Sequence, residues 1–270
     1  MADISRQGAY LLNRDYAATT RLNCQFFLWK TELGFNLHPS IPMPPPGARI
    51  ADVATGTGVW LLDLARQLPG RQLEGFDISL AQCPPIAWLP GDISLQAWDM
   101  FTEPPKELIG KFDIVHLRLL LLVVRDNDPA PIIANAAKML KPGGYIQWDE
   151  LNVFGAFVAT TDVAGVAAGF QSAQELADFT TLEWVKHLPA TMSKQGFCDA
   201  VVQHYDCDLS LAKYFQDMQL LVMEEEVERR LADVREKERV HQQINAIHEE
   251  SKRGIARCTP KMVCVARKPL

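Results

Sequence analysis

The sequence lacks the features that mark metal-binding, nucleic-acid-binding and membrane proteins. Its six cysteines lie far apart, without a C-x-x-C pair, and no histidine pair has zinc spacing, so reduced thiols and no metal are expected. No cluster of lysine or arginine stands out, and a net charge of −6 would repel a phosphate backbone. The longest leucine-valine run, residues 119–124, is far shorter than the roughly 20 residues that span a membrane.

The N-terminal stretch also has no apolar signal core, which predicts a soluble, cytoplasmic protein with neither a nucleic-acid nor a membrane partner. What the chain does have is apolar content. With 270 residues, of which 48% are hydrophobic, it can bury a full core, and one domain with helical additions is expected.

The stretch DVATGTGVW, residues 52–60, combines two glycines with a change of hydrophobic period. A short apolar run precedes it and apolar residues at helical spacing follow, so Thr55 to Gly58 is predicted to be a strand-to-helix turn. Gly56 and Gly58 would allow a ligand close to the backbone, near the positive end of the next helix. The dinucleotide fingerprint has its third glycine where this chain has Leu61, and the P-loop pattern is missing. A corner without any ligand remains the alternative.

Strand and helix patterns alternate after this turn. Strands are expected to end near Asp77 and near Asp99, to begin at Phe112, and to follow the Gly-Gly turn at 143–144. Such alternation predicts an α/β fold with a doubly wound, Rossmann-like sheet and a ligand crevice at the carboxyl ends of its strands. Downstream, a helix is expected to end at Gly196 and a strand is expected near 198–208. A helical stretch with a charged face at 224–250 and a last strand near 258–268 should follow.

The order of these features resembles the class I S-adenosylmethionine-dependent methyltransferases, over residues 47–200 and again at the final strand. The resemblance implies seven strands, the last of them antiparallel. It also implies that Asp77 accepts hydrogen bonds from both ribose hydroxyls and that Asp99 and Met100 meet the adenine. This chain departs from the family pattern in having Ala54 where the first glycine usually stands. The full set of cofactor contacts implied is Ala54, Thr55, Gly56, Gly58, Asp77, Ile78, Asp99, Met100, His116 and Arg21.

A closer resemblance, to small fungal methyltransferases of secondary-metabolite clusters, runs through YLLNRDYAATTRLNCQFFLWKTELGFNLHPSIP, GFDIS, FDIVHLRLLL and GGYIQWDE. In such enzymes N-terminal helices would close over the crevice. The aromatic residues of this segment would then line a substrate pocket or, as the alternative, pack in the core: Tyr10, Tyr16, Phe26, Phe27 and Trp29. Arg21 on the same segment could meet the cofactor's carboxylate or form a surface salt bridge.

Candidate catalytic and substrate-binding residues lie after the start of the fourth strand and at the end of the fifth strand. A neutral His116 could accept a proton from the acceptor, or be a structural histidine, and Arg118 could hold a carboxylate or enolate. Together with Tyr16 and Trp29, Trp148 and Glu150 are expected to wall the substrate pocket. Because strand neighbours alternate faces, neither can point the same way as Asp149.

The resulting hypothesis is methyl transfer from S-adenosylmethionine to an oxygen or nitrogen of a small molecule, in a monomer or homodimer. Residues 1–46 would form a helical lid with a proline-rich linker, and residues 47–270 the cofactor-binding domain with helical insertions at about 155–190 and 208–254. Two alternatives stay open: a pericyclase or dehydratase that uses the bound sulfonium only as a positive charge, and a catalytically silent regulatory subunit that docks through 224–250. The sequence fixes neither the acceptor atom nor the metabolite scaffold.

Overall fold

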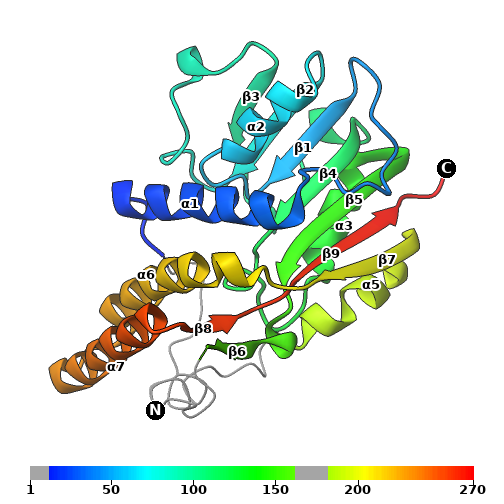
Figure 1. Ribbon diagram of the computed structural model, residues 1–270. Helices are drawn as coiled ribbons and strands as arrows, with labels where there is room; N and C mark the ends of the chain where they lie inside the picture. Colours follow the sequence, from blue (N-terminus) through cyan, green and yellow to red (C-terminus); the bar gives the residue numbers. More distant parts are fainter. Residues whose placement is uncertain (1–11, 162–181) are drawn as a thin grey trace.

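A seven-stranded mixed sheet forms the centre of the molecule (Figure 1). The computed structural model describes residues 12–161 and 182–270. In these residues the strand order is β3-β2-β1-β4-β5-β9-β7, and the neighbours of β9 run antiparallel to it. The strands are β1 (Arg49–Val53), β2 (Gln72–Asp77), β3 (Ile93–Ala97), β4 (Phe112–Arg118), β5 (Leu140–Leu151), β7 (Cys198–Tyr205) and β9 (Lys261–Arg267). The predicted doubly wound sheet with an antiparallel last strand is confirmed.

Helices cover both faces of this sheet. They are α1 (Tyr16–Leu33), α2 (Val59–Gln67), α3 (Ala130–Met139), α5 (Trp184–Lys194), α6 (Ala212–Arg230) and α7 (Val234–Lys252), with short 3₁₀ turns at Ile86–Trp88, Lys106–Leu108, Val153–Gly155 and Leu209–Leu211. Asp15 caps α1 by accepting the Ala18 N–H at 2.9 Å, and Gly34 ends it in the left-handed conformation. The predicted N-terminal helix is therefore present from Tyr16, whereas Tyr10 lies outside the described residues.

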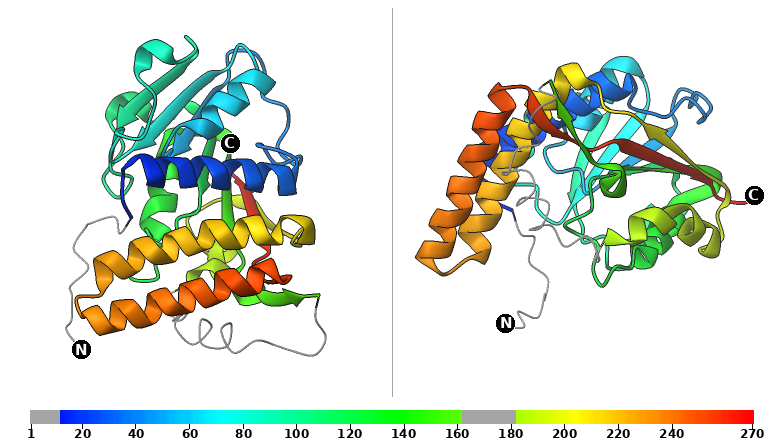
Figure 2. Two further views of the ribbon diagram at one scale, coloured as in Figure 1. Left: turned by 60° about the vertical axis from the view of Figure 1, so that its left-hand side comes forward. Right: turned by 60° about the horizontal axis from the view of Figure 1, so that its bottom comes forward.

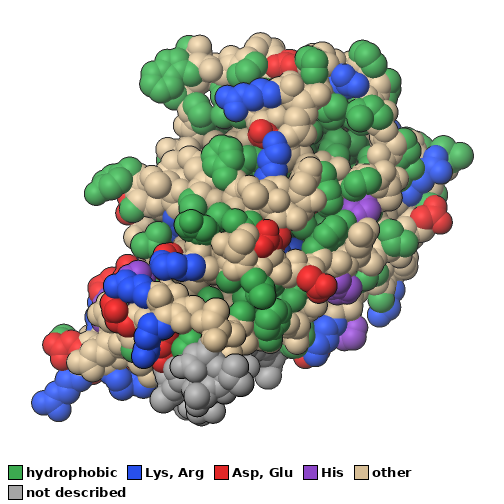
Figure 3. Space-filling model, in the orientation of Figure 1, with side chains coloured by type: hydrophobic (Ala, Val, Ile, Leu, Met, Phe, Trp, Pro, Cys, Tyr) green, Lys and Arg blue, Asp and Glu red, His purple; other side chains and the backbone are tan. Residues whose placement is uncertain are grey.

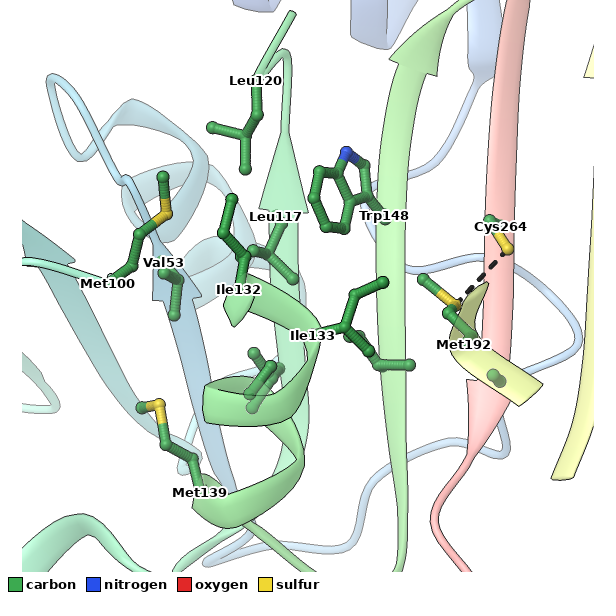
Figure 4. Packing of buried hydrophobic residues seen from close by; sticks show 14 of the residues in the cluster. Val53, Met100, Leu117, Leu120, Ile132, Ile133, Met139, Trp148, Met192 and Cys264 are labelled. Atoms are coloured by element: carbon green, nitrogen blue, oxygen red, sulfur yellow. Dashed lines mark hydrogen bonds between the residues drawn. The ribbon is translucent and has the colours of Figure 1, made fainter. Parts of the chain in front are cut away.

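Two hydrophobic cores lie on opposite faces of the sheet. On one face, α3 and α5 pack over Leu117 and Trp148 (Figure 4). On the other, Phe26, Trp29 and Leu33 of α1 join α2 and the apolar residues of β1 and β9 in a single cluster. A buried ion pair between Glu32 and Lys261 also ties the end of α1 to β9. The N-terminal helix thus shares its core with the sheet.

A helical hairpin and a small second sheet extend the domain. Helices α6 and α7 pack side by side and project from the sheet (Figure 2), and their apolar stripe is buried around Val240, Ile244 and Ile247. Acidic and basic side chains are interspersed over their outer surface (Figure 3). Both helices lie within the stretch 208–254, for which a helical insertion was expected. The insertion expected near 155–190 begins with β6 (Phe157–Thr160), which pairs with β8 (Ile255–Cys258), and its centre lies outside the described residues.

Candidate active site

The turn between β1 and α2 adopts left-handed backbone at three positions. Gly56 has φ of 59° and Gly58 has φ of 73°, which glycine reaches without steric cost. Ala54 also has a positive φ of 59°, so its methyl group replaces the family's glycine at some cost in strain. Helix α2 begins after Gly58 without a side-chain cap, which leaves its amino end available to a negatively charged group.

Asp77 stands at the end of β2, next to this turn. Its Oδ2 accepts the Gly56 N–H at 2.9 Å and its Oδ1 accepts the Ser79 N–H at 3.1 Å. A carboxylate has about four acceptor sites, so capacity remains for further hydrogen bonds. Burial is the main effect on this group, and it raises the pKa of Asp77 above its ordinary value despite the two N–H donors.

The loop after β3 lies beside Asp77, because the Trp98 N–H donates to the Asp77 carbonyl at 2.8 Å. Asp99 Oδ1 accepts the Phe101 N–H at 3.0 Å. The Asn135 amide on α3 donates to the carbonyls of Met100 and Thr102, at 2.9 Å each, and fixes this loop. Of the two apolar candidates, Met100 is buried, whereas Ile78 is 53% exposed. The structure thus brings the glycine turn, Asp77 and Asp99 together at one edge of the sheet.

Helix α1 covers the glycine turn. The Thr57 hydroxyl donates to Asn23 Oδ1 at 2.7 Å, and a Cβ placed on Gly56 would lie 3.8 Å from the Leu22 side chain. The Gln82 amide donates to the Thr19 hydroxyl at 3.3 Å. These contacts hold one face of α1 against the loops that carry the candidate cofactor residues.

Arg21 points away from the surface. It is 3% exposed, and its Nε donates to Glu225 Oε1 of α6 at 2.8 Å, so the ion pair considered from the sequence exists but is buried. The same Glu225 accepts the Asn13 N–H. In the described structure Arg21 joins α1 to α6, and its contact with a cofactor carboxylate stays a prediction.

A row of buried polar side chains crosses the sheet beneath α1 and α2. In this buried polar row, Asp52 accepts the Thr55 hydroxyl at 2.6 Å and contacts His116 Nδ1 at 2.7 Å. His116 Nε2 lies 3.3 Å from Asp149, which also accepts the Gln147 amide at 2.8 Å. The row therefore connects the glycine turn to β5 through side chains of three neighbouring strands.

His116 is held on every side. It is 1% exposed, and its ring stacks on that of Trp60 with centroids 4.0 Å apart and an interplanar angle of 2°. Burial, the largest effect, opposes a charge on the ring, but the hydrogen bonds and charges of Asp149 and Asp52 outweigh it and hold the pKa of His116 above its ordinary value. The two carboxylates thus stabilise the protonated ring relative to a free imidazole, and the role of His116 as a base stays a prediction.

The remaining candidates lie on different faces. Arg118 Nε is 3.6 Å from Asp149, and its guanidinium faces the rings of Phe26 and Trp29. Trp29 is 1% exposed in the core, and Tyr16 is 87% exposed at the start of α1. Trp148 and Glu150 share the opposite face of β5 from Asp149, as strand alternation predicted, and both are fully buried. The role of Tyr16, Trp29, Trp148 and Glu150 in a substrate pocket stays a prediction.

Sequence reasoning missed two members of the buried polar row, Asp52 and Gln147. Asp52 does leave a signal, since it is the one charged residue within the apolar run at residues 50–54. Gln147 is likewise a polar residue in a buried part of its strand, β5. Its amide donates to the Asn36 carbonyl at 3.0 Å and its oxygen accepts the His38 N–H at 2.8 Å. Polar residues inside buried strands are therefore the pattern that would have found both.

Comparison with known proteins decides the family. A family model described as a methyltransferase domain matches residues 29–229 of this chain. The chain belongs to this family. It is a class I S-adenosylmethionine-dependent methyltransferase domain, with S-adenosylmethionine as the family's cofactor.

The relatives named here are fungal proteins. This methyltransferase domain is 40% identical over 124 residues to the methyltransferase grgD of Penicillium sp. The matched segment covers 43% of this chain and 42% of grgD. The N-methyltransferase tcpN of Claviceps purpurea is 33% identical, over 52% of this chain and 51% of tcpN. The secondary metabolism regulator LAE1 of Hypocrea atroviridis is 28% identical, over 54% of this chain and 42% of that protein. The chain thus spans about half the length of the curated relatives it matches.

Solved structures support the fold alone. Phosphoethanolamine N-methyltransferase 2 of Haemonchus contortus, solved with phosphomonomethylethanolamine and S-adenosylhomocysteine, matches with a TM-score of 0.53 at 16% identity, covering 94% of this chain and 59% of that one. The residues of this methyltransferase domain fit such a cofactor chemically. Asp77 keeps acceptor capacity for a diol, and the uncapped start of α2 suits a carboxylate.

Proposed function

We propose that the chain transfers a methyl group from S-adenosylmethionine to a nitrogen or oxygen of a small fungal metabolite. The observation that carries the proposal is the contact between Gly56 and Asp77, which sets a half-buried carboxylate against a left-handed glycine turn. That arrangement suits a ligand that has both a diol and a close approach to backbone. The names of tcpN and other relatives, which are N-methyltransferases, support nitrogen as the acceptor.

The chain's own residues would supply binding, orientation and protection from water. When bound, the cofactor supplies a methyl group activated by its sulfonium charge. Asp77 would bind the ribose, Asp99 and the loop fixed by Asn135 would hold the adenine, and α1 would cover the glycine turn. For a methyl transfer, such positioning and exclusion of water can provide much of the rate enhancement.

The hydrogen bonds of His116 bear on which acceptor atom the enzyme would use. Both ring nitrogens face carboxylates, so His116 could act as a base only after releasing Asp52 or Asp149. An amine that is already neutral has a free lone pair and needs no base before it attacks the methyl group. We therefore place nitrogen ahead of oxygen as the acceptor, with His116 as an orienting group in the buried polar row.

A labelling experiment tests this proposal. The protein is incubated with methyl-labelled S-adenosylmethionine and a panel of amine-bearing and hydroxyl-bearing fungal metabolites, and products are analysed by mass. The expected result is label in an amine product, with release of S-adenosylhomocysteine. The matched control is Asp77→Ala, which should lose transfer at a cofactor concentration that saturates the wild type. A product of unchanged methyl count, formed without S-adenosylhomocysteine, would contradict methyl transfer.

Regulation is a second candidate function, and the similarity to LAE1 favours it. A regulator could keep the cofactor site and have no small-molecule acceptor. Calorimetry separates the two functions when combined with the labelling assay. Cofactor binding without transfer to any metabolite in the panel supports the regulator, whereas transfer to an amine supports the enzyme.

A further inference from the structure

Glu150 is a buried carboxylate that the methyl-transfer chemistry leaves without a task. It lies near the end of β5 on the face covered by α3 and α5, and it is 0% exposed. Trp148, two residues earlier on the same face, packs against Trp184 of α5 with ring centroids 5.4 Å apart. In Figure 4 the indole nitrogen of Trp148 is directed toward the end of the sheet at which Leu120 lies. A carboxylate enclosed in this way is costly unless hydrogen bonds or an opposite charge compensate for the lost water.

Three donors of the chain converge on this carboxylate. Glu150 Oε2 accepts the Leu120 N–H at 2.8 Å and lies 3.4 Å from the Trp148 indole nitrogen, while Oε1 accepts the Leu151 N–H at 3.0 Å. All three groups can only donate, so they suit the ionised form of the side chain and leave a protonated carboxyl without an acceptor for its proton. The Leu120 bond is the one that reaches out of β5.

That bond fixes a sharp bend after β4. Leu119 has a positive φ of 57°, a conformation that costs free energy for a residue with a side chain. Its own N–H donates to the Asp149 carbonyl at 3.0 Å, and the next N–H, of Leu120, donates to Glu150. Both donors of the bend are thus held by two consecutive residues of β5.

The bend lies beside the glycine turn. Strands β4 and β1 are parallel neighbours, with Leu117 opposite Val53, so the chain leaves β4 next to the point where Ala54 begins the turn. The turn that follows, residues 121–123, is made of leucine and valine. A change in the backbone conformation of the bend would therefore displace an apolar segment at the edge of the candidate active site.

We propose that Glu150 is a positioning residue, whose carboxylate holds the bend at Leu119 and Leu120 beside the glycine turn and whose protonation loosens it. The proposal rests on the proposed function only in taking that edge of the sheet as the site. Glu150 touches the backbone of the bend, and its effect on a substrate would pass through that segment.

The charge on Glu150 should change near neutral pH. The pKa of Glu150 is raised to about 7, chiefly by burial and to a smaller extent by the negative charge of Asp149 on the other face of β5, against the lowering effect of its three donors. The neighbours that face it from the bend and from β5 are a backbone N–H and an indole, which do not titrate in this range. As the pH falls below about 7, the fraction of carboxylate falls and the bend should loosen.

Hydrogen exchange tests this without any acceptor molecule. Peptides that contain Leu120 are followed by mass spectrometry in the wild type, in Glu150→Gln and in Glu249→Gln, a control that changes an exposed carboxylate. We expect exchange on the order of tenfold faster in Glu150→Gln, the equivalent of one charge-assisted hydrogen bond, and wild-type exchange in the control. After correction for intrinsic rates, wild-type protection should fall below pH 7, while Glu150→Gln shows no such midpoint.

Equal protection in Glu150→Gln and wild type, or a pH midpoint that persists in the variant, overturns the proposal. If Glu150→Gln does not fold, Trp148→Phe is used to test the proposal instead, because it keeps an aromatic ring and removes one donor to Glu150 Oε2. Its pH midpoint should move upward, and an unchanged midpoint overturns the proposal. Since no methyl transfer is measured, failure of this inference is distinct from failure of the proposed function.

Discussion

At the scale of single residues, Asp77 is the side chain whose replacement should act most directly on the cofactor. We expect Asp77→Ala to weaken S-adenosylmethionine binding by roughly ten- to a hundredfold, the loss of about 1.5 to 3 kcal/mol from hydrogen bonds to a charged group. Isothermal titration calorimetry measures it. Asp92→Ala, at the amino end of the neighbouring strand β3, is the matched control and should bind as the wild type does. An unchanged dissociation constant in Asp77→Ala would remove this residue from the site.

His116 should matter for stability in a pH-dependent way. His116→Ala would leave Asp52 and Asp149 buried without their shared cation, and we expect a loss of about 3 to 5 kcal/mol at pH 6. The pKa of His116 is raised in the folded state, so its stabilisation is complete below the unfolded value near 6.5 and is lost as the pH rises through the folded value.

Urea denaturation of wild type and His116→Ala at a series of pH values checks this prediction. The difference in the free energy of unfolding should shrink as the pH rises. A difference that grows with pH would mean that the imidazole is neutral in the folded protein and that Asp52 and Asp149 are separated by other means.

At the scale of elements, α1 should behave as part of the core. Trp29 is 1% exposed against the sheet, and we expect Trp29→Ala to lower the free energy of unfolding by about 3 to 5 kcal/mol. Phe27, a neighbouring aromatic residue on the same helix, is 53% exposed and provides the control. Phe27→Ala should change stability by less than about 1 kcal/mol. Equal, small losses in both variants would indicate a lid that detaches from an independently stable sheet.

The order of the elements could be predicted from the sequence, and their mutual contacts could not. Strands β1 to β4 lie in short stretches bounded by turn residues, and the approximate places of Asp77 at the end of β2 and of Asp99 after β3 followed from them. The contact between Asp52 and His116 depends instead on the register of β1 against β4, which places them opposite each other. No local pattern encodes that register, just as none pairs Arg21 with Glu225 across 204 residues.

The same limit applies to the faces of helices. The aromatic residues at the start of the chain have helical spacing, which left open whether they line a pocket or fill a core. The structure gives Trp29 and Phe26 to the core and leaves Tyr16 and Phe27 exposed. That division depends on where the sheet and α6 contact α1, which is a property of the tertiary fold.

At the scale of the whole molecule, cofactor binding should raise the unfolding temperature, because only the folded chain assembles the glycine turn, Asp77 and Asp99. S-adenosylmethionine at about 100 times its dissociation constant stabilises the folded state by about 2.7 kcal/mol. For a domain of this size we expect a rise of about 5 to 10 °C, measured by differential scanning fluorimetry. Asp77→Ala at the same concentration should show a much smaller rise. An equal rise in the variant would place binding elsewhere on the molecule.

The position of β9 between β5 and β7 has a consequence for synthesis on the ribosome. Strand β7 is complete at Tyr205, and its partner β9 begins only at Lys261. At translation speeds of about 5 to 20 residues per second, the chain spends roughly 3 to 11 seconds with the facing edges of β5 and β7 unpaired. During that interval the nascent chain offers two open strand edges, the kind of surface that recruits chaperones or pairs with a neighbouring nascent chain. Completion of this sheet is therefore a late event, which depends on one seven-residue strand.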